Sequence, residues 1–146
     1  MSPLPLPLPA DLAALSDAVT TVAGVNVTQL SATQRKERLT QLRAAIDTLE
    51  VCFDTTVAAS DTAGDGALLD GATSTTAWLR HTLRLTPRDA ATHVRTARTL
   101  GPDTDAPGAA APAVAAVLDG TLSYPHLQTI TATLTDDSAV LEGNLG

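Results

Sequence analysis

The chain has 146 residues, of which 44% are hydrophobic and 2% are aromatic, and its formal net charge at pH 7 is −7. This length favours one domain with a core of its own, and the acidic charge excludes a protein that coats nucleic acid over its whole surface. Because Cys52 is the only cysteine, an internal disulfide and a cysteine-rich zinc site are excluded as well.

The N-terminal stretch MSPLPLPLP predicts a disordered, extended leader over residues 1–9. A proline at every second position prevents the apolar helix of a signal peptide, and the stretch lacks the basic residues that precede such a helix. No apolar run in the sequence approaches the roughly 20 residues that cross a membrane as a helix. We therefore expect a cytoplasmic protein without a membrane partner, with one helical domain over residues 10–146.

Two helices are predicted in the first part of this domain. Apolar residues recur every three or four positions between Leu12 and Val22, which predicts a short amphipathic helix over residues 10–23. Ser31 and Gln34 match a capping box, so a long helix is expected over residues 32–59. We expect its apolar stripe to face the core and its charged residues, Asp47 and Asp54 among them, to lie on the other faces. The stripe consists of Leu39, Leu42, Ile46, Leu49, Phe53 and Val57.

A loop and two closely spaced helices are predicted next. The stretch SDTAGDGALLDGATS, residues 60–74, is rich in glycine and aspartate and predicts a loop. A helix is expected from Thr73 or Ser74 to about Arg84. The sequence Thr86-Pro87-Arg88-Asp89 is a strong start signal for another helix, which should end at Leu100 before Gly101-Pro102.

The remaining sequence predicts a connector over residues 101–112, a short helix to Leu118 and a last helix that opens at Ser123. Because no stretch alternates apolar and polar residues over enough length, no strand is predicted. The fold class is therefore all-α, a small bundle of about five to six helices that contains a helix-turn-helix-like pair. The last helix has barely formed an apolar face where the sequence stops, so we expect a bundle truncated at its C-terminus.

Basic residues concentrate in the helix-turn-helix-like pair. Five of the nine Lys and Arg residues fall within residues 72–100, where Asp89 is the only acid. On a helical wheel, Thr92 and Arg95 lie within about 40° of Arg88, on the face opposite the small apolar residues. The resulting candidates for nucleic-acid binding are Arg80, Arg84, Arg88, Thr92, Arg95 and Arg98.

Two interpretations of this basic face are open. An arginine fork can hold a phosphate or a guanine edge, so the face could lie against DNA. The pattern by itself favours the alternative, a solvated face that balances acids such as Glu37, Asp47 or Asp54, because charged faces are most often simply solvated. Three phosphate contacts would give a salt slope of only about −3, so a monomer would need a second copy or an attached domain to hold a DNA site.

No catalytic, cofactor-binding or metal-binding residue is predicted. His93 lies at the edge of an apolar face and is expected to be a hydrogen-bonded structural imidazole, while His81 has no metal-binding partner at helical spacing. His126 is expected in the first turn of the last helix, where capping or exposure to solvent explains it. Cys52 is expected to be a small buried hydrophobic residue. The paired acids Asp103/Asp105 and Asp136/Asp137 are expected in loops, where no raised pKa is anticipated.

Two segments, LDGATSTTAWLRHTLRLTPRDAATHVRTARTL and PAVAAVLDGTLSYPHLQTITATL, resemble the actinobacterial family of the domain of unknown function 222, or 13E12 repeat. The likeness covers roughly residues 35–135. Many members of that family continue into an HNH nuclease domain, so the resemblance implies a helical, DNA-associated module that delivers a nuclease. The matching positions are Ser74, Thr75, Trp78, Leu79, Leu85, Thr86, Pro87, Arg88, Arg95, Arg98, Gly120, Leu122, Ser123 and His126.

The sequence has no cysteine pairs and no His-Asn-His arrangement, so nuclease catalysis does not carry over. A truncated member, a split gene product and a free-standing domain all remain open. We expect a non-catalytic helical module that associates weakly with the DNA backbone. The alternative is a protein–protein interaction scaffold without nucleic-acid binding, which docks another protein through the helix over residues 32–59 and the exposed seam of the unfinished bundle. Its partner would be a separate nuclease domain or a second copy of the chain.

Overall fold

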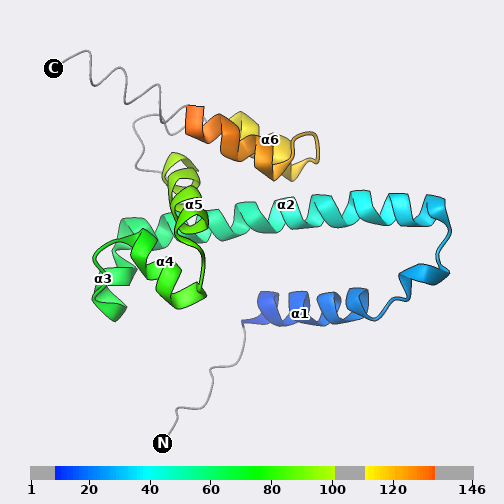
Figure 1. The fold of residues 1–146 in the computed structure, drawn as a ribbon, viewed down its shortest axis with the longest axis horizontal. Helices are drawn as coiled ribbons and strands as arrows, with labels where there is room; N and C mark the ends of the chain where they lie inside the picture. Colours follow the sequence, from blue (N-terminus) through cyan, green and yellow to red (C-terminus); the bar gives the residue numbers. More distant parts are fainter. Residues whose placement is uncertain (1–8, 101–110, 134–146) are drawn as a thin grey trace, which may run out of the picture. The chain divides into compact units, whose positions relative to one another are not determined.

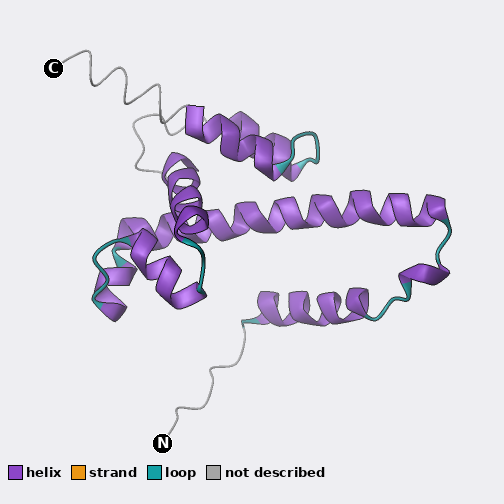
Figure 2. Cartoon of the chain, in the orientation of Figure 1, coloured by secondary structure: helices purple, strands orange, loops and turns teal. Residues whose placement is uncertain are grey.

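The computed structural model describes residues 9–100 and 111–133, with 111–113 described by their backbone alone. Within these ranges every regular element is helical, which confirms the predicted all-α class (Figures 1 and 2). Residues 124–133 are helical as well. The elements in chain order are α1 (Ala10–Ala23), the 3₁₀ turn η1 (Val27–Gln29), α2 (Ala32–Ala63), α3 (Asp65–Asp70), α4 (Thr75–Leu83), α5 (Pro87–Leu100) and α6 (Ala111–Leu118).

The chain divides into two compact units, residues 1–40 and residues 41–146. The first unit holds the predicted capping box. The Ser31 hydroxyl accepts from the backbone N–H of Gln34 at 3.1 Å, and the side-chain oxygen of Gln34 accepts from the backbone N–H of Ser31 at 2.8 Å. Arg38 donates to the carbonyl oxygen of Val22 at 3.0 Å and so ties α1 to the first turns of α2. The second unit carries the candidate site.

The predicted loop over residues 60–74 is wrong for most of its length. α2 continues to Ala63, and residues 65–70 form α3. Gly64 and Gly71 have φ values of 72° and 63°, which glycine adopts at little cost, so they terminate helices instead of forming a loop. The lone pair of leucines between them gave no helical period from which α3 could be predicted.

In the part of α2 that belongs to the second unit, the apolar stripe predicted to face the core is confirmed at Phe53 and Val57 and wrong at Ile46 and Leu49. Ile46 and Leu49 are 45% and 42% exposed, although Val57 is buried and Phe53 is half-buried. The buried residues of α2 are Asp47, Val51, Asp54, Val57 and Ala58. Most of them share a face turned by about one residue, or 100°, from the predicted stripe. The two aspartates expected on solvated faces are therefore inside. Asp47 forms an ion pair with Arg43, and Asp54 accepts hydrogen bonds from two other helices.

Two apolar clusters hold the second unit together. The first joins Val57 and Ala58 of α2 to Leu79 of α4 and to three small residues of α5, namely Ala90, Val94 and Ala97. Ala90 and Ala97 are 0% exposed, so α5 packs closely through its alanines, as the small apolar face of its sequence predicted. The second cluster is smaller and consists of Val51, Val117, Tyr124 and Leu127.

The start signals of α4 and α5 act as predicted. The Ser74 hydroxyl accepts from the Ala77 amide at 3.1 Å, and the Thr86 hydroxyl accepts from the Asp89 amide at 3.1 Å. Arg84 ends α4 with a φ of 56°, so the chain reverses within three residues before Pro87. This turn confirms a helix-turn-helix-like pair.

Ser74→Ala is expected to lower the free energy of unfolding by about 1 kcal/mol, since an amide at the start of α4 loses its acceptor. Urea unfolding followed through the fluorescence of Trp78, the single tryptophan, measures this change. Thr73→Ala removes a hydroxyl from the exposed residue just before the cap and is the matched control. Equal losses in both variants would contradict the assigned cap.

Candidate functional site

Four of the predicted binding residues are exposed arginines, two at the end of α4 and two on α5. Arg80 and Arg84 are one turn apart at the end of α4, and Arg88 and Arg95 are two turns apart on α5. All four are exposed, whereas the opposite side of α5 is buried. In the part of the chain that the structure describes, none of the four forms an ion pair. We call Arg80, Arg84, Arg88 and Arg95 the arginine face.

Arg98 is held by α2. Its Nε lies 3.0 Å from Oδ2 of Asp61 and its Nη2 lies 3.3 Å from Oδ1, while the Thr75 hydroxyl donates to Oδ1 at 2.5 Å. The hydrogen bond from Arg98 lowers the pKa of Asp61, and the same bond raises the pKa of Arg98. At this position the alternative interpretation of the basic face holds, in which an arginine balances an acid of the domain. The acid is Asp61 and not one of those anticipated.

Thr92 is half-buried, and its hydroxyl donates to the carbonyl oxygen of Arg88 at 2.8 Å. Its hydrogen is thus engaged within α5, and only the oxygen lone pairs remain to accept. Of the six predicted binding residues, the structure leaves four arginines exposed on α4 and α5 and gives Arg98 and Thr92 partners within the domain.

A buried polar cluster, which we call the Asp54 cluster, was not predicted as a unit. Asp54 of α2 is 0% exposed, and its Oδ1 accepts from Nδ1 of His93 at 2.7 Å. The Tyr124 hydroxyl donates to Oδ2 of Asp54 and lies 3.2 Å from the same imidazole nitrogen. The prediction that His93 is a hydrogen-bonded imidazole is confirmed. Its partners escaped prediction because they lie 39 and 31 residues away; the only hint was the spacing of Asp54 with Val51 and Ala58.

Aromatic contacts and charge tune the Asp54 cluster. Phe53 meets the imidazole edge-on, with ring centroids 4.9 Å apart, and Tyr124 stacks on it at 6.2 Å. The hydrogen bond to Asp54, with the negative charges of Asp54, Glu50 and Asp89, raises the pKa of His93 against the opposing effect of burial. Burial and the Asp54 carboxylate raise the pKa of Tyr124 well above its ordinary value, so its phenol stays protonated.

The other chemically reactive candidates have ordinary surroundings. His81 is exposed, and Nδ1 of His126 lies 2.8 Å from the Ser123 hydroxyl at the start of the last helix. Cys52 is exposed, so the expectation of a buried thiol is wrong; it directly follows buried Val51 and therefore points about 100° away from the buried face. The paired acids at 103/105 and 136/137 lie outside the described residues.

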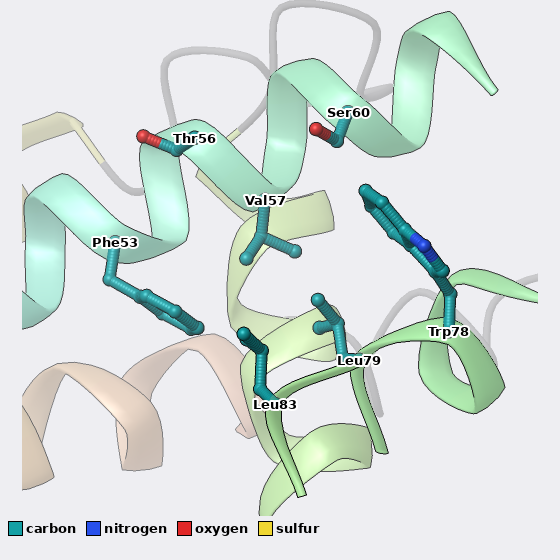
Figure 3. Close-up of a pocket in the computed structure, with 7 residues that line it drawn as sticks. All are labelled: Phe53, Thr56, Val57, Ser60, Trp78, Leu79 and Leu83. Atoms are coloured by element: carbon teal, nitrogen blue, oxygen red, sulfur yellow. The ribbon is translucent and has the colours of Figure 1, made fainter. Parts of the chain in front are cut away.

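An open apolar pocket of about 140 Å³ lies between α2 and α4. Figure 3 shows Val57 of α2 facing Leu79 and Leu83 of α4, with the rings of Phe53 and Trp78 at the two ends. Thr56 and Ser60 are its only hydroxyl-bearing lining residues. Its walls suit an apolar group and offer no charged side chain to orient a polar one.

Among residues 9–100 and 111–133, no group of three His, Cys, Asp or Glu side chains could hold a metal ion. In the same residues, none of the helices combines the length and the apolar character needed to cross a membrane.

One comparison with known proteins gives a match. A family model described as "Domain of unknown function (DUF222)" matches residues 33–140, which include the Asp54 cluster and the arginine face. Searches of curated proteins and of solved structures give no match.

Proposed function

Because the chain belongs to the DUF222 family, we propose its function from its own surface: a non-catalytic helical module that binds the DNA backbone weakly through Arg80, Arg84, Arg88 and Arg95. The observation that carries this proposal is the exposure of all four arginines on one helix pair, without an ion pair to another described residue. In an acidic protein such a concentration of cations attracts a polyanion locally and leaves the rest of the surface repelling it.

The arrangement supports backbone contact better than base recognition. Arg80 and Arg84 end α4 while Arg88 begins α5, so three cations lie around one tight turn. Guanidinium groups there can each grip a phosphate through paired hydrogen bonds. With Arg98 bound to Asp61, at most four phosphates are neutralised, and log K should fall with log [salt] at a slope no steeper than about −3.6.

A salt slope this shallow means weak binding. The proposed module therefore acts together with a second copy or a joined domain. An HNH nuclease segment, on the same polypeptide or encoded beside it, is the partner that the family resemblance suggests. The proposal places the protein in the cytoplasm with its DNA. Sequencing the DNA downstream of the coding region for an in-frame HNH segment tests this part independently of binding.

We expect Arg88→Gln/Arg95→Gln to weaken binding to a duplex of about 20 base pairs by about tenfold at low salt. The salt slope should also become shallower by nearly 2, since two phosphate contacts are lost. Fluorescence anisotropy over a salt series measures both quantities.

The matched control is Arg35→Gln/Lys36→Gln, which removes the same charge from two exposed residues of the first unit. This control should bind DNA as the unaltered chain does. Absence of binding by the unaltered chain at 50 mM salt, or equal losses in the two double variants, would overturn the proposal.

A second candidate function is protein docking through self-association. It is favoured by the exposure of Leu68 and Leu69 on α3, which are 78% and 69% exposed, and of Leu83 beside the apolar pocket, which is 45% exposed. Light scattering that shows a stable dimer dispersed by Leu68→Gln/Leu69→Gln, together with no DNA binding, would favour this function over the first.

A further inference from the structure

The proposed DNA contacts leave the imidazole of His93 unused, although both of its nitrogens face carboxylates of α2. Nδ1 lies 2.7 Å from Oδ1 of Asp54, and Nε2 lies 3.9 Å from Oε2 of Glu50. These two acids are one turn apart on α2, whereas His93 belongs to α5. One ring of α5 therefore lies between two acids of the helix against which the buried residues of α5 pack.

The strength of this contact between the two helices depends on one proton. Only the protonated imidazole carries a hydrogen on both nitrogens and a positive charge. Asp54 is 0% exposed, and it fastens α2 both to α5 through His93 and to the last helix through Tyr124. A neutral ring still donates a hydrogen bond to this buried carboxylate but leaves its negative charge without a cation. The imidazole side chain is 16% exposed, so the proton can exchange with solvent.

The charged groups around His93 lie on α2 and α5. The hydrogen bond to Asp54, together with the charges of Asp54, Glu50 and Asp89, raises the pKa of His93 against the opposing effect of burial. Tyr124, from the last helix, lies 3.2 Å from Nδ1 as a neutral phenol and adds no charge. Because Asp54 and Glu50 belong to α2, separating α5 from α2 removes the hydrogen bond and two of the three charges that favour the proton.

We propose that His93 is a pH-dependent latch between α5 and α2, which holds the two helices together most firmly while its imidazole is protonated. The pKa of His93 is higher in the folded chain than its ordinary value of 6.5, so the latch contributes its full stabilisation below about pH 6.5. This stabilisation is lost as the pH rises through the folded-state pKa. The unfolding equilibrium constant of the second unit then rises tenfold for each pKa unit between the two values.

Urea unfolding of the full chain between about pH 5.5 and 9 tests the latch. The single tryptophan, Trp78, packs against the apolar cluster that joins α2 to α5, so its fluorescence reports the loss of that packing. The pKa of His93 in the folded chain is measured separately by ¹⁵N NMR of the imidazole. We expect the unfolding constant to rise by the factor that this pKa predicts, with most of the rise between pH 6.5 and the measured value.

The variant His93→Asn keeps a donor near the position of Nδ1 but cannot take up a proton, so this rise should be absent. Glu50→Gln removes one acid of α2 and should make the rise smaller. His81→Asn/His126→Asn removes the other two histidines, both exposed, and should keep the full rise.

A rise that persists in His93→Asn would overturn the proposal. So would an unaltered chain in which the pKa of folded His93 does not exceed 6.5 or the unfolding constant ignores its titration. Both of these measurements on the unaltered chain are independent of whether any variant folds.

Discussion

Replacing Asp54 by alanine is expected to lower the free energy of unfolding of the second unit by about 3 kcal/mol. The carboxylate is 0% exposed and accepts from both His93 and Tyr124, so its removal strands two donors from two other helices at a buried site. Urea unfolding monitored by circular dichroism and by Trp78 fluorescence measures the loss.

Asp47→Ala is the matched control, since Asp47 is also buried and lies two turns earlier on the same face of α2. Its partner Arg43 approaches at 3.0 Å, but the Arg43 side chain is 54% exposed and can return to water. We therefore expect a loss below about 1 kcal/mol. If Asp54→Ala costs no more than Asp47→Ala, the Asp54 cluster does not fasten the helices as described.

Gly66→Ala is expected to destabilise the second unit by about 1–2 kcal/mol, even though alanine favours helices over glycine by about 1 kcal/mol. A Cβ atom at this position would lie 2.9 Å from Cγ and 3.0 Å from Cβ of Trp78. The Cβ atom of Trp78 is fixed to its backbone, so the clash is relieved only if the indole turns or if α3 moves away from α4. Either movement stretches the 2.7 Å hydrogen bond from Trp78 Nε1 to Asp70.

The measurement combines urea unfolding with the emission maximum of Trp78, which should shift to the red as the indole gains water. Gly24→Ala is a suitable control, because Gly24 has a φ of −79° and its added Cβ would find no atom closer than 3.6 Å. Unchanged emission and stability in Gly66→Ala would contradict the packing of α3 on α4 through this glycine.

The arginine face could be predicted because exposure on a single helix is a local property. Arg88, Thr92 and Arg95 share one side of α5 by periodicity alone, and the opposite alanines are buried as expected. The fate of Arg98 could not be predicted in the same way. Its partner Asp61 lies 37 residues earlier, at a position that the sequence assigned to a loop.

The burial of Asp54 was even harder to predict from the sequence than the partner of Arg98. A leucine-rich stripe and a mixed stripe with two aspartates run side by side along α2, and hydrophobicity favours burial of the first. The mixed stripe is buried because α5 and the last helix bring a hydrogen-bond donor each to Asp54. Periodicity counts apolar residues on one helix and contains no term for donors that arrive from elsewhere.

The sequence by itself determined the helical class, the bounds of α1 and α5, the caps at Ser31, Ser74 and Thr86, and the placement of basic residues around the turn before Pro87. These features depend on interactions within a few residues, which periodicity and capping chemistry encode. Only the tertiary structure decided which face of α2 is inside and which arginine is held. Those outcomes depend on contacts between helices far apart in the chain, where one buried hydrogen bond can outweigh the burial of an apolar side chain.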